Sequence, residues 1–286
     1  MIICVVGPTG VGKTKMSVEL AKKYNGIIVN CDAMQVYKEM DIATAKVTKE
    51  EKEGIKHYLF DICNLEDNYT IFDYQKDARK IIEENKNKNI IFVGGSGLYL
   101  KSALFDYRFS NDEDNNTYDN LTNEELYDLC VKKDKDMNIH VNNRKRLIRF
   151  LNRKEEIVVE PKLLYKNVYF IGLTTSRDKL YKIINERVDK MMENGLLKEA
   201  KYFYDKKVNC KALNTVIGYK ELFKYFNNEC TLEEALDLIK KNSRHYAKRQ
   251  YTWFNNQMNI EWFDVFYDNF NNTVEEVIKF IDNGDK

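Results

Sequence analysis

The chain has 286 residues, a length that accommodates one large domain or two smaller ones. Its 46 Lys and Arg residues nearly balance 45 Asp and Glu residues, and the net charge of +1 excludes a uniformly basic nucleic-acid-binding protein. Any nucleic-acid-binding surface must therefore be local. The six cysteines show no metal-ligand spacing with one another or with the three histidines, which argues against a zinc site.

The first apolar segment begins at residue 2, and no apolar run approaches the ~18 residues that a membrane-spanning helix needs. We therefore expect no signal peptide, no membrane association and a cytoplasmic location.

The strongest motif lies at the start of the chain, where an apolar run at 2–6 precedes G-P-T-G-V-G-K-T and a helical pattern at 15–24. A strand before and a helix after are the setting in which this motif forms a P-loop, whereas a chance match would be a plain glycine-rich turn. Backbone N–H groups, the helix dipole and the Lys13 ammonium would bind phosphate, and the Thr14 hydroxyl could hold Mg²⁺. The expected phosphate- or diphosphate-binding residues are Gly7, Pro8, Thr9, Gly10, Val11, Gly12, Lys13 and Thr14.

Two further segments should bring polar side chains to the same edge of a parallel sheet. A strand at 27–30 leads into Asp32, and a strand at 90–93, after an amphipathic helix at 70–84, leads into a glycine-rich turn with Ser96. Both should face the ligand crevice with the P-loop, because the carboxyl ends of parallel strands line it. The alternatives are a loop or helix-capping aspartate and a plain turn. No aspartate follows the strand at 90–93, which counts modestly against nucleotide hydrolysis.

The segment from 106 to about 165 interrupts the alternation of strands and helices and predicts an inserted, mostly helical domain. Helical patterns cover 123–133 and 142–154. In the second helix, Arg146, Arg149 and Arg153 recur at helical spacing on one face. An arginine excess without matching acids is typical of RNA contact, and a solvated helix face is the alternative.

The α/β pattern resumes with a strand at 168–173 and a helix at 177–193 that carries Arg187. Further helices are expected at 195–204, 216–226 and 232–251. Basic side chains such as Lys248 and Arg249 stand beside aromatic ones at the end of the last helix, a combination that suits RNA. The elements together predict an α/β protein with a P-loop NTPase-like parallel sheet flanked by helices at 1–105 and 166–286, and a mostly helical insertion at 106–165.

These motifs together resemble those of the tRNA dimethylallyltransferases (tRNA isopentenyltransferases), and the resemblance runs nearly end to end. The segments that carry it are GPTGVGKT, CDAMQVYKEMDIATAK, GGSGLYLKSAL, IHVNNRKRLIR, ERVDKMMENGLLKE, VIGYKEL and YAKRQYTWF. The second and the last are highly specific, whereas the P-loop alone would fit many families.

The resemblance implies a prenyl transfer rather than ATP chemistry. The P-loop would hold dimethylallyl diphosphate, and the acceptor would be the N6 amine of the adenosine directly 3′ of the anticodon, in tRNAs that read codons beginning with U. That base must be flipped out of its stack to reach the enzyme. The product would be N6-(dimethylallyl)adenosine, with release of diphosphate. We expect a monomer.

The family's functional residues carry over to positions of this chain. Lys13, Thr14 with Mg²⁺, and Arg187 would neutralise the departing diphosphate. Asp32 would accept the N6 proton, and the Ser96 hydroxyl would contact the acceptor. The implied tRNA-binding residues are Asp32, Ala33, Met34, Gln35, Ser96, Lys145, Arg146, Arg149, Lys248, Arg249, Gln250 and Trp253.

The chain also departs from the family's pattern. Ala33 replaces a serine, Lys145 a glutamine, Ile183 an arginine one turn before Arg187, and Asn255 an arginine. These departures bear on tRNA binding and affinity more than on the chemistry.

Two other functions fit part of the pattern. A P-loop small-molecule or nucleoside kinase would also use the P-loop and Asp32, but it leaves the basic helices unexplained. A non-catalytic RNA-binding protein on a P-loop scaffold would not need an intact Lys13, Thr14 and Asp32.

Overall fold

The computed structural model describes residues 1–109, 118–152 and 161–284. It divides into two compact units, Met1–Phe105 with Leu163–Lys286, and Asp106–Lys162. The insertion therefore ends three residues earlier than expected. Leu163 pairs with Phe105, and the Leu164 N–H donates to the Leu104 carbonyl at 2.9 Å, so the returning chain already belongs to the first unit.

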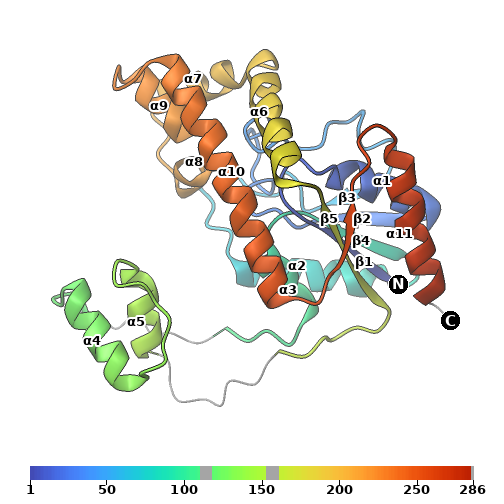
Figure 1. The fold of residues 1–286 in the computed structure, drawn as a ribbon, viewed down its shortest axis with the longest axis horizontal. Helices are drawn as coiled ribbons and strands as arrows, with labels where there is room; N and C mark the ends of the chain where they lie inside the picture. The colour runs from blue at the N-terminus through green and yellow to red at the C-terminus, as the bar shows by residue number, and fades with distance from the viewer. Residues whose placement is uncertain (110–117, 153–160, 285–286) are drawn as a thin grey trace. The chain divides into compact units, whose positions relative to one another are not determined.

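The first unit is built on a six-stranded parallel sheet of order β3-β2-β4-β1-β5-β6 (Figure 1). The expected α/β fold with a parallel sheet is confirmed. The strands are β1 Ile2–Val6, β2 Gly26–Asn30, β3 His57–Tyr58, β4 Asn89–Val93, β5 Val168–Thr174 and β6 Glu261–Asp264. The short edge strands β3 and β6 were not expected, since neither has the apolar run of a central strand.

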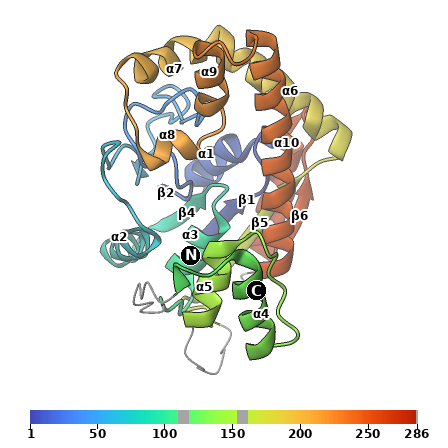
Figure 2. The ribbon, with the colours of Figure 1, turned by 90° about the vertical axis from the view of Figure 1, so that its left-hand side faces the viewer.

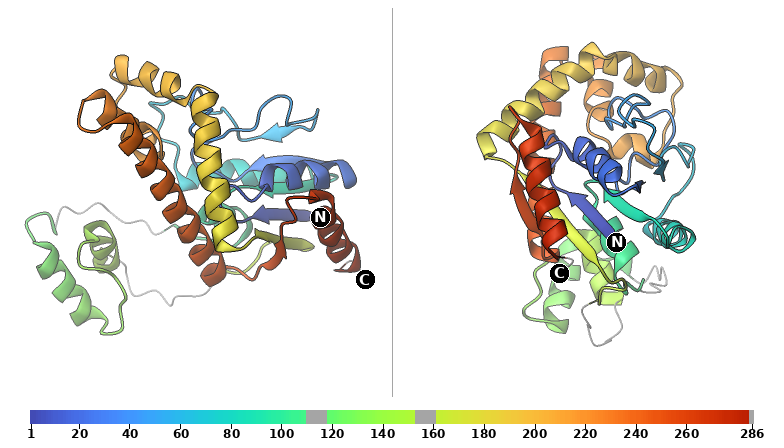
Figure 3. Two further views of the ribbon diagram at one scale, coloured as in Figure 1. Left: turned by 45° about the horizontal axis from the view of Figure 1, so that its top comes forward. Right: turned by 90° about the vertical axis from the view of Figure 1, so that its right-hand side faces the viewer.

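Alternation along the strands builds two separate cores. In β1, Ile3 and Val5 face the helices α1 and α11, whereas Ile2, Cys4 and Val6 face α2 and α3. Figure 3 shows α1 and α11 on one face of the sheet. The bounds of these helices are α1 Lys13–Lys23, α2 Ile71–Glu84, α3 Gly97–Leu104 and α11 Phe270–Gly284.

A third core forms among the helices beyond the sheet. Figure 2 shows α7, α8 and α9 gathered at one end of the long helices α6 and α10. Phe203, Tyr219 and Ile239 are among its buried members. The bounds are α6 Arg177–Glu193, α7 Leu196–Asp205, α8 Lys211–Thr215, α9 Tyr219–Phe226 and α10 Leu232–Gln257. Helix α10 extends six residues beyond the expected end at Tyr251. This extension places Phe254 in the core between the sheet and helices α2 and α3.

The described residues of the second unit form two helices, α4 Asn123–Lys133 and α5 Arg144–Asn152. Thr122 and Glu125 form a capping box at the start of α4. A small core contains Leu126, Cys130 and Leu147, on the inner faces of the two helices. Among the described residues, no helix combines the length and apolarity that crossing a membrane requires.

Candidate active site

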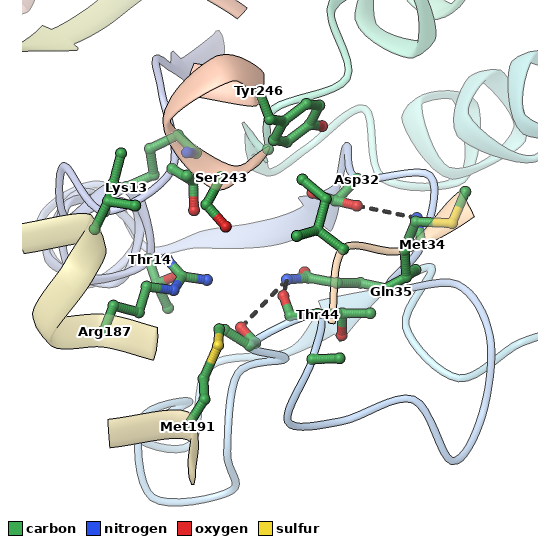
Figure 4. A pocket seen from close by; sticks show the side chains of 18 of the residues that line it. Lys13, Thr14, Asp32, Met34, Gln35, Thr44, Arg187, Met191, Ser243 and Tyr246 are labelled. Atoms are coloured by element: carbon green, nitrogen blue, oxygen red, sulfur yellow. Dashed lines mark hydrogen bonds between the residues drawn. The ribbon is translucent and has the colours of Figure 1, made fainter. Parts of the chain in front are cut away.

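A cavity of about 830 Å³ opens at the carboxyl ends of the central strands. It is lined by the P-loop, the segment after β2, the turn after β4, and helices α6 and α10 (Figure 4). The predicted residues that line it are Thr9, Gly10, Gly12, Lys13, Thr14, Asp32, Ala33, Met34, Gln35, Ser96, Arg187, Arg249 and Gln250. This is the crevice that the parallel-sheet argument predicted.

The P-loop takes the backbone shape that its glycines permit. Gly7, Gly10 and Gly12 have φ of 137°, 91° and 90°, and a Cβ at Gly7 would meet the Leu173 carbonyl oxygen at 2.5 Å. Helix α1 begins directly after Gly12, so its first N–H groups and its dipole lie at the loop. The loop therefore has the positive-φ glycines and the adjoining helix N-terminus on which the phosphate-binding prediction rests.

Lys13 is held inside this loop. Its Nζ donates to the Gly7 carbonyl at 3.0 Å and to the Pro8 carbonyl at 2.7 Å. Burial, with Arg187 as the second cause, lowers the pKa of Lys13 from 10.5 to about 7, against the pull of Asp32. The surroundings of the Lys13 ammonium contain too little negative charge to stabilise it fully, so an anion bound beside it would raise the pKa of Lys13 toward its usual value.

Arg187 enters the same cavity from α6. Its pKa is lowered by burial, and Asp32 and Glu51 oppose that shift. Figure 4 shows the Arg187 guanidinium near Thr14. Ile183 also lines the cavity one turn earlier, at the position where the resemblance described above implies an arginine. Two enclosed cations near one another favour a ligand with at least two negative charges.

Asp32 is fixed by its own neighbours. The Asn30 amide donates to the Asp32 carbonyl at 3.0 Å and to the Leu59 carbonyl at 2.9 Å, and its oxygen accepts the Asp32 N–H at 2.9 Å. One Asp32 carboxylate oxygen accepts the Met34 N–H at 3.0 Å. Asp32 therefore makes the hydrogen bond within its own loop that the alternative interpretation predicted, and its side chain also lines the cavity.

The glycine-rich turn after β4 is a packing device as well as a cavity wall. The Ser96 hydroxyl accepts the Ala33 N–H at 3.1 Å, which ties the turn to the segment after β2. A Cβ at Gly94 would meet the Cys31 carbonyl oxygen at 2.1 Å, and one at Gly95 would meet the Gln250 amide at 1.9 Å. The backbone contact at Gly94 therefore permits only glycine, and a side chain at Gly95 would displace the Gln250 amide.

Gln250 joins this turn to the P-loop. Its oxygen accepts the Thr9 N–H at 2.9 Å, and its amide nitrogen donates to the Gly95 carbonyl at 3.2 Å. Trp253, one turn later, packs against Gly97, where a Cβ would lie 2.0 Å from the indole ring. Both residues were expected at the tRNA surface, and both hold α10 against the turn after β4.

One face of α10 turns toward the cavity, and most of its residues were not predicted from the sequence. Asn242, Ser243 and Tyr246 line it, ahead of Arg249 and Gln250. Burial, and then Asp32, raise the pKa of Tyr246, so its hydroxyl stays protonated and can donate a hydrogen bond. Figure 4 shows Tyr246 on the same side of the cavity as Asp32. The α10 residues that line the cavity recur every three or four positions, and this spacing was the signal in the sequence that they share one helix face.

Several predicted residues lie elsewhere. Gly7, Pro8, Val11, Lys248 and Trp253 do not line the cavity. Lys145 and Arg146 are exposed on α5 in the second unit, as is Arg149. Arg153 lies outside the described residues.

A parallel sheet with a P-loop at the end of β1, and a cavity lined by two cations and a carboxylate, define an α/β protein of the P-loop class. The family model for IPP transferase matches residues 35–257. The chain belongs to the IPP transferase family, whose members transfer a prenyl group rather than a phosphoryl group, so a kinase is not favoured.

Individual relatives agree with this assignment. The chain is 43% identical to the tRNA dimethylallyltransferase of Anoxybacillus flavithermus, over 98% of this chain and 96% of that protein. Its structure is similar to that of the tRNA isopentenylpyrophosphate transferase of Bacillus halodurans, with a TM-score of 0.77 and 40% identity over 99% of this chain and 95% of that one. A eukaryotic dimethylallyltransferase acting on tRNA also has a TM-score of 0.77, with 28% identity over 92% of this chain and 73% of that one.

Proposed function

We propose that this protein transfers a dimethylallyl group from dimethylallyl diphosphate to the N6 amine of the adenosine directly 3′ of the anticodon, in tRNAs that read codons beginning with U. The observation that carries the proposal is one cavity in which Lys13 and Arg187, both with lowered pKa values, lie near the Asp32 carboxylate. Cations suit the diphosphate of the donor, and the carboxylate suits the amine of the acceptor.

On the donor side, the task is to stabilise charge on the leaving group. The P-loop N–H groups, Lys13 and Arg187 would bind the diphosphate oxygens. As the bond between the allylic carbon and oxygen breaks, the electron pair leaves with the diphosphate, and the two cations stabilise it. Their poor solvation in the free protein strengthens this interaction, since little water screens it.

Mg²⁺ fits this site as a second source of positive charge. Among the described residues no cluster of three or more His, Cys, Asp or Glu could hold a metal, but Thr14 offers a hydroxyl in the cavity. Mg²⁺ usually binds one or two protein oxygens together with substrate phosphates. A single protein hydroxyl, that of Thr14, is therefore compatible with a Mg²⁺ site completed by the diphosphate. When bound, it would neutralise diphosphate charge.

On the acceptor side, Asp32 would act as the base. The N6 amine forms the new bond to the allylic carbon and gives up one proton to Asp32, at the carboxylate oxygen that does not accept the Met34 N–H. Ser96 and Tyr246 offer hydroxyls near this point. The products are the dimethylallylated base, diphosphate and one proton.

The tRNA would be bound outside the cavity. Exposed cations on α5 (Lys145, Arg146 and Arg149) and on α10 (Lys248 and Arg249) suit phosphate contacts. Ala33, Met34 and Gln35 line the cavity beside Asp32 and would meet the flipped base. Because the similar tRNA dimethylallyltransferase of Anoxybacillus flavithermus is a bacterial tRNA-modifying enzyme, we propose a cytoplasmic location. We expect a monomer by light scattering.

The direct test is incubation of the protein with unmodified tRNA, Mg²⁺ and dimethylallyl diphosphate, followed by mass spectrometry of the nucleosides. We expect N6-(dimethylallyl)adenosine at the position after the anticodon. A parallel reaction with ATP and nucleoside acceptors tests the kinase function. ATP turnover stimulated by a small acceptor, without prenylated tRNA, would contradict the proposal.

A further inference from the structure

One wall of the cavity is a segment without regular structure, Asp41–Ala45. Ala43, Thr44 and Ala45 line the cavity. Ala45 has φ of 46°, a left-handed conformation that is disfavoured for a residue with a Cβ. Such a conformation persists only where the surrounding structure holds it, so the contacts that hold this wall matter.

The main contact comes from Glu199 on α7. Its carboxylate accepts three successive backbone N–H groups, from Asp41 at 3.1 Å, Ile42 at 2.8 Å and Ala43 at 3.0 Å. The Tyr219 hydroxyl donates to the same carboxylate at 2.7 Å. Burial, and then Glu199, raise the pKa of Tyr219, so it remains a donor. Four donors on one carboxylate form a strong, charge-assisted clamp.

The other end of the segment is held from the opposite direction. The Gln35 amide nitrogen donates to the Thr44 carbonyl at 2.9 Å and to the Ala45 carbonyl at 3.3 Å. Gln35 lines the cavity, whereas Glu199 does not. Glu199 therefore does not contact a substrate in the cavity, but it holds a segment that does line it.

The wall lies beside the apolar part of the cavity. Val47, Met191 and Leu196 also line the cavity, and Ala43 and Leu196 would both contact a Cβ at Gly218. Figure 4 shows Thr44 and Met191 on the side away from Tyr246. This apolar part lies in the same cavity as the enclosed cations, and it matches the hydrocarbon end of a prenyl diphosphate better than it matches RNA.

We propose that Glu199 is a positioning residue for the prenyl donor, which fixes Asp41–Ala45 as a cavity wall and thereby sets donor affinity. The inference rests on the proposed function for the identity of the donor. In Glu199→Gln, one carbonyl oxygen replaces two carboxylate oxygens and the new NH₂ group faces N–H donors. Some of the four hydrogen bonds must therefore break.

The test measures three quantities in Glu199→Gln: the KM for dimethylallyl diphosphate, the Kd for tRNA, and amide hydrogen exchange of the peptide around 41–45. We expect donor KM to rise about tenfold, the tRNA Kd to stay within twofold, and exchange to accelerate in this segment. The matched control is Glu193→Gln, an exposed glutamate at the end of α6, which should leave all three unchanged.

A folded Glu199→Gln whose donor KM equals that of the wild type would overturn the inference, as would an equal weakening of tRNA binding. If Glu199→Gln does not fold, Tyr219→Phe decides, because it removes one donor and keeps the carboxylate. We expect it to raise donor KM about threefold, and an unchanged KM overturns the inference. Failure of the proposed function is distinguishable, since the wild type would then form no prenylated tRNA while the exchange readout would still test the clamp.

Discussion

The two units use basic side chains in opposite ways. In the first unit, Lys13 and Arg187 are enclosed, and burial lowers the pKa of each. In the second unit, Lys145 and Arg146 are exposed on α5, and neither side chain has a hydrogen-bond or ion-pair partner among the described residues. Enclosed cations bind a small anion strongly and with fixed geometry, whereas solvated ones suit an extended polyanion and respond to salt.

Arg144 shows that basic residues within the second unit also differ. Its guanidinium donates to the Leu121 carbonyl at 2.5 Å, the Tyr118 carbonyl at 2.8 Å and the Asp119 carbonyl at 3.1 Å. It holds the turn before α4 and supports a core that contains only a few buried side chains. Arg144 is therefore structural, whereas the side chains of Lys145 and Arg146 are exposed.

The largest effect should come from the chemistry of the enclosed site. Asp32→Asn keeps an oxygen for the Met34 N–H but cannot accept the amine proton. We expect the single-turnover rate to fall ~10²–10⁴-fold, with donor binding unchanged by equilibrium titration. Asp237→Asn, at an exposed position on α10, is the control. Near-normal turnover in Asp32→Asn would make Asp32 a positioning residue only.

Removal of an enclosed cation should follow. Lys13→Ala deletes charge that opposes the developing diphosphate, and we expect kcat/KM for the donor to fall about 10²–10³-fold. Lys23→Ala removes an exposed lysine from the same helix and should change nothing. Steady-state kinetics compare them, and equal losses in both variants would erase the distinction between enclosed and solvated cations.

The pH dependence tests the same distinction without mutation. Because the pKa of Lys13 is lowered to about 7 in the free protein, the ammonium is charged below that pH and becomes neutral above it. Donor binding must recharge it, so kcat/KM for the donor should fall above pH 7, up to about tenfold per pH unit. The kcat at saturating donor should change less. A kcat/KM that stays flat from pH 6 to 9 would contradict the lowered pKa.

The smallest effect should come from the solvated cations. Replacing Arg146 and Arg149 by Ala should weaken tRNA binding and reduce the slope of log K against log salt by ~0.7–0.9 for each lost phosphate contact. Filter binding at 50–200 mM salt measures this slope. Lys132→Ala on α4 is the control for net charge. An unchanged slope would mean that these arginines form a solvated face and nothing more.

Most of the local structure could be predicted because its causes are close in sequence. The P-loop needs only a strand, spaced glycines and a helix, which here follow one another within the first two elements of the chain. Helix α11 was missed although Phe270, Val274, Val277 and Ile281 carry a helical spacing. Strand β6 was missed because its residues Glu261–Asp264 lack an apolar run.

The class of fold, the P-loop and the acidic residue that lines the same cavity could be predicted from the sequence, because each follows from a motif of adjacent residues. How these parts are joined depends on contacts that form only in the folded chain. Gln250 holds Thr9 across 241 residues of chain, and Glu199 holds Ile42 across 157. Such hydrogen bonds leave no periodic pattern in the sequence. A polar residue that binds a distant segment cannot be distinguished there from a polar residue on a solvated helix face. The lowered pKa of Lys13 likewise exists only once the folded chain has removed its water.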